Sequence, residues 1–157
     1  MQEKSGGHPS LISPPTKYPL ALLGLGIICL DLFTKALVLS LPAVGIWVVN
    51  GIGLKLTMNS GLAFGLGRGW LPLALQLTAT IAVLVWLWHL IKTPSGLLLR
   101  LPATIIASGA IANVIDRLID KRIIDFVVLG SWPAFNVADS AITIGIILAL
   151  THSWPRR

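Results

Sequence analysis

The chain of 157 residues contains few charged side chains and one cysteine. Only 11% of its residues are Asp, Glu, Lys or Arg, whereas 55% are hydrophobic, a balance outside the usual range for soluble globular proteins. Cys29 has no partner within the chain, which excludes an intrachain disulfide, and we expect it to be a small buried hydrophobic residue. The formal charge of +6 is scattered singly or in pairs. Without a basic stripe, a nucleic-acid partner is not expected.

The sequence is dominated instead by four long apolar segments, approximately residues 19–41, 70–91, 97–118 and 134–154. A helix that crosses a hydrocarbon core of about 30 Å needs about 20 residues, and each segment reaches that length. None carries a polar stripe that could face water, so the helices of a soluble bundle are excluded. We predict an all-α integral membrane protein with four transmembrane helices. Residues 19–157 would form one domain after a flexible cytoplasmic tail, residues 1–18.

The basic residues outside these segments predict the orientation. An even number of spans places both termini on the same side of the membrane. The basic residues expected on that side are Lys4, Lys17, Lys92, Arg100, Arg156 and Arg157. The opposite side would hold fewer: Lys55, Arg68, Lys121 and Arg122. Because cytoplasmic loops carry an excess of Lys and Arg, both termini are predicted to be cytoplasmic.

The connection between the first two segments has a pattern of its own. Residues 46–49 are β-prone, residues 50–53 read Asn-Gly-Ile-Gly, and residues 54–58 alternate apolar and polar like a half-buried strand. We therefore predict a small β-sheet element on the outer face, at about residues 43–69. It would be too small to stand alone and would rest on the membrane surface or on the helices. Residues 92–96, with Pro94 and Gly96, predict a tight turn.

Ionisable side chains inside the bilayer cost about 2.5–3.5 kcal/mol each at mid-helix, so each one needs an explanation. The first segment holds Asp31 and Lys35, which are four residues apart and share a helical face. We interpret them as a neutralised pair with a structural or supporting role. Asp31 is expected nearer the middle of the membrane than the other acids.

Asp116 and Asp139 form the more informative pair. The third helix would run outward to Asp116 and, after a short outer loop, the fourth would run inward past Asp139, placing both carboxylates just beneath the outer surface. Two carboxylates in a pocket of low dielectric cannot both ionise easily, so they share a proton and divide into general acid and general base. A structural alternative stays open, in which Asp116 pairs with Arg117 or Lys35.

Asparagines accompany both acids, since Asn113 and Asn136 each lie three residues before one of them and share its helical face. This matched spacing predicts one polar cavity lined from two helices. The four oxygen-bearing side chains could also hold a divalent metal. However, no third carboxylate is expected at that depth, and all three histidines are predicted on the other side: His8, His89 and His152. No metal is therefore expected.

Five blocks of sequence, in order along the chain, resemble lipoprotein signal peptidase, the bacterial signal peptidase II. They read Asp31-Leu32-Phe33-Thr34-Lys35, Asn59-Ser60-Gly61-Leu62-Ala63-Phe64-Gly65, Gly109-Ala110-Ile111-Ala112-Asn113-Val114-Ile115-Asp116-Arg117, Ile124-Asp125-Phe126 and Phe135-Asn136-Val137-Ala138-Asp139-Ser140. The resemblance covers nearly the whole chain after the tail. Ser108 and Ala112 depart from it, because that family usually has glycine at both positions.

The resemblance implies that Asp116 and Asp139 are a catalytic aspartate dyad. It implies a supporting or substrate-binding role for five further residues: Asn59, Gly61, Asn113, Arg117 and Asn136. Asp31 and Lys35 would orient the site. No cofactor or metal is implied.

The implied reaction is hydrolysis of the bond just before a diacylglyceryl-modified cysteine, which removes the signal peptide from a prolipoprotein. The resemblance also implies a multi-pass monomer in the bacterial cytoplasmic (inner) membrane, surrounded by lipid, with its active site near the outer face. The alternatives are a small membrane transporter or proton-relay protein and a scaffold that recognises lipid or peptide. A relay needs acids spread across the bilayer, whereas Asp116 and Asp139 are expected at one face.

Overall fold

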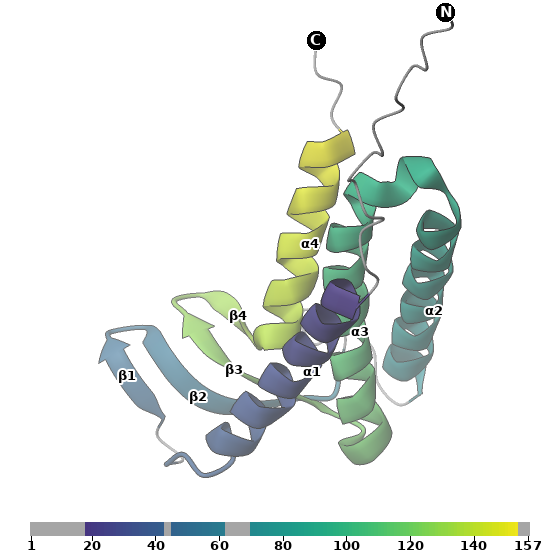
Figure 1. Ribbon diagram of the computed structural model, residues 1–157. Coiled ribbons are helices and arrows are strands. Elements are labelled where there is room, and N and C mark those ends of the chain that lie inside the picture. Colours follow the sequence, from purple (N-terminus) through teal and green to yellow (C-terminus); the bar gives the residue numbers. More distant parts are fainter. Residues whose placement is uncertain (1–17, 43–44, 62–69, 154–157) are drawn as a thin grey trace, which may run out of the picture.

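The computed structural model describes residues 18–42, 45–61 and 70–153 of the chain (Figure 1). In order, its elements are α1 (Tyr18–Val38), β1 (Ile46–Val49), β2 (Ile52–Asn59), α2 (Leu71–Lys92), the 3-10 turn η2 (Pro94–Gly96), α3 (Leu97–Asp120), β3 (Ile123–Leu129), β4 (Trp132–Phe135) and α4 (Val137–Ser153). The predicted tail lies outside the described residues except for Tyr18, which begins α1, and so does the later part of the first connection, residues 62–69.

The helices pack around α3, which contacts α1, α2 and α4 (Figure 1). Three helices, α1, α2 and α3, are long and apolar enough to cross a membrane, whereas α4 has 17 described residues. At about 1.5 Å per residue, the described part of α4 is about 25 Å long, somewhat less than a hydrocarbon core of about 30 Å. Large apolar side chains such as Leu22, Phe33, Val85 and Ile147 are exposed on the outside of the bundle. An apolar exterior of this kind is typical of helices that face lipid.

Cys29 corrects one expectation, because its side chain is exposed rather than buried. It lies on α1 in an apolar run whose neighbour Leu30 is also exposed. In a helix that faces lipid, an apolar residue can lie on the outside, so apolar character alone did not predict burial.

The central helices approach closely at glycines. A Cβ atom added at Gly109 would lie 2.4 Å from the carbonyl oxygen of Ala138 on α4, so the bulk of a side chain there would separate α3 from α4. A Cβ atom at Gly24 of α1 would lie 2.7 Å from Oγ of Ser108 on α3. Ser108, one of the two departures noted above, therefore occupies space that the glycine on α1 leaves free. Ala112, the other departure, is completely buried.

One antiparallel sheet has the strand order β1-β2-β3-β4. The predicted hairpin of the first connection is confirmed as β1 and β2, with Ile46 opposite Leu54. The prediction of a short loop between the last two helices was wrong, because a second hairpin, β3 and β4, lies there. The predicted helix at residues 134–154 likewise begins only at Val137. A short apolar run cannot be assigned to strand or helix from its hydrophobicity alone.

The sheet lies at one end of the bundle, where α3 ends and α4 begins (Figure 1). The expectation that β2 is half-buried was wrong, since most of its side chains are exposed, and β1 is exposed throughout. By contrast, the first four residues of β3 are buried. The inner strand thus packs where the sheet meets the helices, and this junction is where the predicted site residues gather.

Candidate active site

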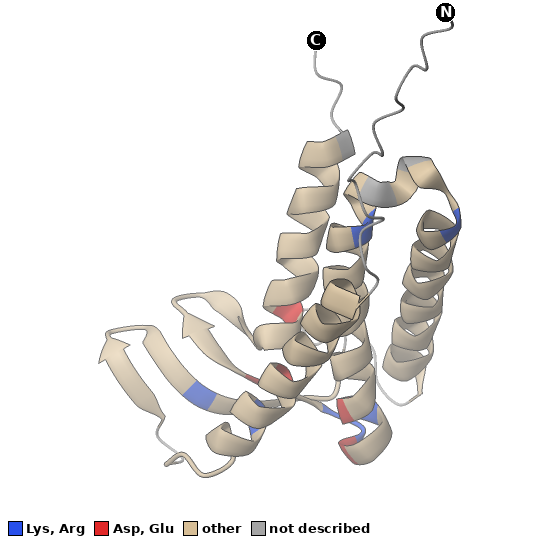
Figure 2. Cartoon of the chain, in the orientation of Figure 1, with Lys and Arg blue, Asp and Glu red and all other residues tan. Residues whose placement is uncertain are grey.

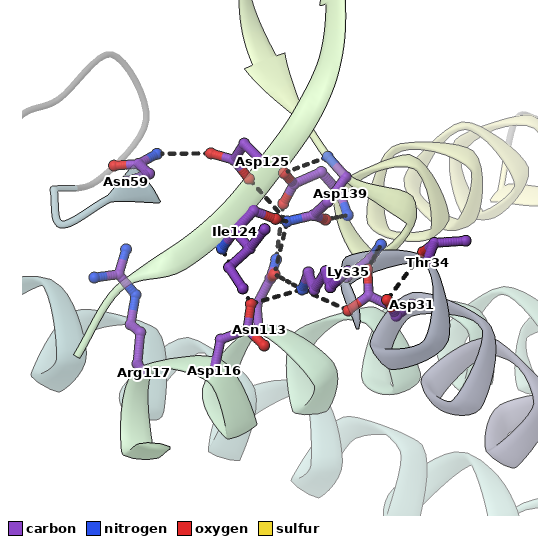
Figure 3. Close-up of polar contacts among 12 residues, drawn as sticks. Asp31, Thr34, Lys35, Asn59, Asn113, Asp116, Arg117, Ile124, Asp125 and Asp139 are labelled. Carbon is purple, nitrogen blue, oxygen red and sulfur yellow. Dashed lines mark hydrogen bonds and ion pairs between the residues drawn. The ribbon is translucent and has the colours of Figure 1, made fainter. Parts of the chain in front are cut away.

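Polar side chains from α1, α3, α4 and the inner strands converge at this junction (Figure 3). The described acidic residues all lie toward the sheet end of the bundle (Figure 2). Seven members of the network are buried: Asp31, Lys35, Asn113, Asp116, Arg117, Asp125 and Asn136. Buried polar groups in an apolar surrounding are costly unless they are paired, so their partners indicate what each one does.

Asp31, Lys35 and Asp116 form what we call the lysine cluster. Nζ of Lys35 lies 2.5 Å from Oδ2 of Asp31 and 2.7 Å from Oδ2 of Asp116. Asp31 also accepts a hydrogen bond of 2.8 Å from the backbone N–H of Ala138 in the first turn of α4. Asp116 accepts one of 3.3 Å from the backbone N–H of Ile124. The cluster therefore connects α1 to α3, α1 to the start of α4, and α3 to β3.

Two expectations are decided by these contacts. Asp116 pairs with Lys35, which is one of the two partners left open by the structural alternative. Asp31 was expected deeper in the membrane than the other acids, and this was wrong, because its carboxylate contacts the start of α4 next to Asp139. The position of a residue along its helix does not by itself fix its depth, which also depends on how that helix packs against its neighbours.

Asn113 links the lysine cluster to Asp139. Its Nδ2 donates to Oδ1 of Asp139 at 2.7 Å, and its Oδ1 accepts a weak hydrogen bond of 3.5 Å from Lys35. The same oxygen accepts from Nδ2 of Asn136 at 3.2 Å. The two asparagines are thus in direct contact, as expected of one cavity, although Asn136 lies just before α4 and not on a helix.

Asp125 of β3 and Asp139 of α4 form what we call the cavity pair, and they lie next to each other in Figure 3. Asn136 contacts both carboxylates: Nδ2 donates to Asp125 at 2.8 Å, and the backbone N–H donates to Asp139 at 3.4 Å. Its Oδ1 in turn accepts from the backbone N–H of Asp139 at 2.8 Å. Asn59 donates to the second oxygen of Asp125 at 3.1 Å. Neutral amides, not cations, hold this pair.

Asp125 is a carboxyl group with an unusual proton affinity. Burial above all, and then the charge of Asp139, raise its pKa to about 6. The hydrogen bonds from Asn59 and Asn136 and the charge of Lys35 oppose the increase. A carboxyl group with this pKa exchanges its proton near neutral pH, as general acid–base catalysis requires.

A cavity of about 960 Å³ opens between the sheet and helices α2, α3 and α4, and the cavity pair lines it. Asn59, Asn113 and Arg117 also line it. Its wall is otherwise mainly apolar, with side chains that include Leu75, Ala79, Val83, Ile106, Ala110, Trp132, Phe135, Ile142 and Ile146. The lining contains no member of the lysine cluster among the residues that the structure describes. Of the four acids at the junction, the two that line the cavity are Asp125 and Asp139.

The sequence reasoning did not assign Asp125 or Gln76 to the site. Asp125 is the only charged residue in the strand Ile123–Leu129, a signal that could have identified it. Gln76 is the only amide side chain in α2 and accepts a hydrogen bond from Nε of Arg117. Nη2 of Arg117 donates to the carbonyl oxygen of Gly61, and the N–H of Gly61 donates to Oδ1 of Asn59 at 3.0 Å. Asn59, Gly61 and Arg117 therefore belong to one connected set.

In the described part of the chain, no three His, Cys, Asp or Glu side chains are grouped as ligands for a metal ion.

Comparison with known proteins identifies the family of the chain. Residues 23–155 match the family described as Signal peptidase (SPase) II. The lipoprotein signal peptidase of Syntrophomonas wolfei is 42% identical over 130 residues, which cover 79% of this chain and 85% of that protein. That of Moorella thermoacetica is 32% identical over 137 residues, covering 83% and 89%. A solved structure of a bacterial membrane enzyme superposes with a TM-score of 0.77 at 23% identity, covering 90% of this chain and 96% of that one, which shows a shared fold. The chain belongs to the signal peptidase II family.

Proposed function

We propose that this protein is an intramembrane aspartic endopeptidase that removes the signal peptide from diacylglyceryl-modified prolipoproteins, cleaving just before the lipidated cysteine. Membership of the signal peptidase II family and its lipoprotein signal peptidase relatives support the reaction and the class of substrate. The observation that carries the catalytic type is the cavity pair: two carboxyl groups held by the same asparagine at the wall of one cavity.

We assign the catalytic roles to Asp139 and Asp125. The sequence pairs Asp139 with Asp116, and that assignment stays a prediction, but the contacts favour Asp125 in its place. Asp116 is held by Lys35 at 2.7 Å and does not line the cavity, so its carboxylate is engaged with a cation away from the substrate space. Asp125 faces the cavity, and its pKa of about 6 suits a group that gives and takes a proton.

The arrangement supports hydrolysis with one shared proton. The ionised member of the cavity pair removes a proton from water, which attacks the carbonyl carbon of the scissile bond. The protonated member donates to the carbonyl oxygen and so stabilises the tetrahedral intermediate. When the intermediate collapses, that proton returns to its carboxylate, the C–N bond breaks, and the departing amine takes the proton that came from water. The amides of Asn59, Asn113 and Asn136 hold the two carboxylates without neutralising them. Coupled carboxyl groups titrate as a pair, so the shared proton belongs to both members.

The cavity suits a substrate that is partly peptide and partly lipid. Its polar end holds the cavity pair, and its apolar wall continues along α2, α3 and α4. A signal peptide is apolar, and the diacylglyceryl chains of the modified cysteine are even more apolar. Contact with apolar side chains therefore lowers the free energy of both parts of the substrate relative to exposure to water. The chain thus offers an apolar surface on which a membrane-borne substrate approaches the carboxylates from within the bilayer.

The same proposal includes the arrangement in the membrane. All four helices would span the membrane, including α4 with its slightly shorter apolar length. They would form one domain of residues 19–157, with both termini in the cytoplasm. The sheet and the cavity pair would then lie near the outer face, and the enzyme would act as a monomer in the bacterial inner membrane. Lys92 and Arg100, near the opposite end of the bundle, support this orientation (Figure 2). A proton-relay protein is not favoured, because Asp31, Asp116 and Asp139 gather at one end of the bundle.

The test is cleavage of a diacylglyceryl-modified prolipoprotein by the purified protein in detergent. Wild type is expected to release the signal peptide, to leave the unmodified prolipoprotein uncut and to retain its activity in EDTA. Asp139→Asn is expected to be folded and inactive. A folded wild type that never cleaves, or an Asp139→Asn variant that turns over at the wild-type rate, would end the proposal. Strong inhibition by EDTA would favour a metal-dependent hydrolase instead.

A further inference from the structure

Gln76 lies on α2, in a helix that is otherwise almost entirely apolar, and no role follows for it from the reaction described above. Its carbonyl oxygen Oε1 accepts a hydrogen bond from Nε of Arg117 on α3. Gln76 is only partly buried and lines the cavity, whereas Arg117 is 4% exposed. An arginine buried in this way needs acceptors that fix the plane of its guanidinium group, and Gln76 supplies one of them.

The other end of the guanidinium group leads to Asp125. Nη2 of Arg117 donates to the carbonyl oxygen of Gly61, just after β2. The N–H of Gly61 donates to Oδ1 of Asn59 at 3.0 Å, which fixes which way the Asn59 amide points. Nδ2 of Asn59 then donates to Oδ2 of Asp125 at 3.1 Å (Figure 3). The hydrogen bonds thus form an unbroken series from α2 to a carboxylate of the cavity pair.

We propose that Gln76 is a positioning residue for the catalytic pair, acting through Arg117, Gly61 and Asn59 on the carboxyl group of Asp125. We call this series of hydrogen bonds the amide relay. The proposal rests on the proposed function, because it assigns Gln76 a part in setting Asp125 for proton transfer. Nε and Nη2 of one guanidinium group hold two acceptors in a fixed plane, so loss of either acceptor frees the group to turn.

The relay sets the proton affinity of Asp125 as well as its position. The hydrogen bond from Asn59 lowers the pKa of Asp125 against the effect of burial, so a weaker hydrogen bond raises that pKa. Two other charged groups, Asp139 on α4 and Lys35 on α1, act on Asp125 and stay in place when Gln76 is changed. Arg117 on α3 keeps its charge, but its guanidinium group is then free to turn. A change at Gln76 that raised the pKa of Asp125 would therefore have passed through Arg117, the second member of the relay.

The test compares Gln76→Met, which keeps the length of the side chain but accepts no strong hydrogen bond, with wild type. The assay is cleavage of a diacylglyceryl-modified prolipoprotein in detergent across a range of pH. We expect kcat to fall about tenfold, the effect of one hydrogen bond to a charged group, with little change in KM. The alkaline limb of the rate profile should move upward by about half a pH unit, since Asp125 holds its proton more tightly. Gln76→Glu, which retains an acceptor for Arg117, should keep most of the wild-type kcat.

The matched control is Thr78→Val, which removes a hydroxyl group from the exposed face of the same helix. The hydroxyl group of Thr78 donates a hydrogen bond to the carbonyl oxygen of Ala74, within α2. It should cleave at the wild-type rate with an unshifted pH profile. Because the relay is serial, combining Gln76→Met with Asn59→Ala should move the alkaline limb no further than Asn59→Ala alone. If Gln76→Met does not fold, Arg117→Lys breaks the same relay, because an ammonium group cannot hold both acceptors in one plane.

Additive effects of Gln76→Met and Asn59→Ala, or an unshifted pH profile for a folded Gln76→Met or Arg117→Lys variant, would overturn the relay. These outcomes are distinct from failure of the proposed function, in which wild type itself would not cleave the lipid-modified substrate.

Discussion

The lysine cluster and the cavity pair lie side by side, yet their carboxylates are held in opposite ways. In the lysine cluster, Asp31 and Asp116 share one ammonium group at 2.5 and 2.7 Å. In the cavity pair, Asp125 and Asp139 receive hydrogen bonds from neutral amides and face open space. A carboxylate in a buried ion pair ties its own helix to that of the cation, whereas Asp125, which is held by amides, has a pKa raised to about 6, mainly by burial. Fold stability and catalysis are thus assigned to different acids.

Asn113 and Asn136 join the two regions. Asn113 accepts from Lys35 and donates to Asp139, and Asn136 donates to both Asn113 and Asp125. Because a primary amide carries both donors and acceptors, it can connect a charged cluster to a reactive one without adding charge to either. The lysine cluster therefore fixes α1 against α3 and α4, and the two asparagine amides orient the carboxylates of the cavity pair relative to it.

The largest expected effect comes from the cavity pair itself. Asp125→Asn and Asp139→Asn each remove an ionisable group of similar shape, and each should lower the cleavage rate by at least about a thousandfold, the range of general acid–base catalysis. Asp120→Asn, at the exposed end of α3, is the matched control and should be as active as wild type. The rates are measured on the lipid-modified prolipoprotein, with folding checked by circular dichroism. Normal turnover by Asp125→Asn would remove this residue from the chemistry.

The next largest effect is expected when the ammonium group of the lysine cluster is removed. Lys35→Met leaves Asp31 and Asp116 buried without their cation, and breaking a buried pair in this way costs about 3–5 kcal/mol of folding free energy. Thermal or denaturant unfolding in detergent measures the loss. Lys55→Met on β2 removes an exposed lysine and should leave the stability unchanged. A Lys35→Met protein as stable as wild type would mean that the cluster does not hold the helices together.

A smaller effect is expected on the pH profile. Asn59 donates a hydrogen bond to Asp125 and lowers its pKa, so Asn59→Ala should raise that pKa from about 6 and move the alkaline limb of activity upward. Loss of one hydrogen bond to a charged group predicts a shift of about one pH unit. Thr57→Val, a polar deletion on the same strand, serves as the control. A downward shift in Asn59→Ala would show that the amide does not stabilise the ionised form.

The smallest expected effect is on stability. The pKa of Asp125 in the folded protein, about 6, is above its ordinary value of 3.8, so the unfolded chain releases this proton at lower pH. The associated stability is present below pH 3.8 and is lost as the pH rises through about 6. Asn at this position carries no such penalty, so Asp125→Asn should unfold roughly 2–4 °C above wild type at pH 8, as about 1 kcal/mol gives at this size. No such gain is expected at pH 3.5, and a gain of equal size there would show that the carboxyl charge is not its cause.

The sequence predicted the helices and the first hairpin because their signals are local. Segment length, the Asn50–Gly53 turn and the alternation in β2 need only neighbouring residues to be recognised. The second hairpin was missed because Trp132–Phe135 is apolar and short, and such a run is compatible with a strand or with the start of a helix. Its pairing with β3 is a tertiary property that no local pattern encodes.

The same distinction explains the site. Asn113 and Asn136 were expected in one cavity and are in contact, but the helical-face argument holds only for Asn113, since Asn136 lies just before α4 and accepts a hydrogen bond from the N–H of Asp139 in its first turn. The partner of Asp116 could not be decided, since it depends on how α1 packs against α3 and brings Lys35 within reach. No strand was predicted around Asp125, and it is the strand β3 that turns its side chain inward toward Asn136.

The most direct measurement of the central claim is the cleavage rate of Asp116→Asn, normalised to folded enzyme and compared with that of Asp125→Asn. Removing Asp116 leaves Lys35 and Asp31 as a balanced buried pair, so the variant should fold and retain activity within about a hundredfold of wild type, the cost of slight misplacement. Asp125→Asn should be far less active. The reverse ranking, with Asp116→Asn folded but inert and Asp125→Asn turning over, would contradict the account and return Asp116 to the chemistry.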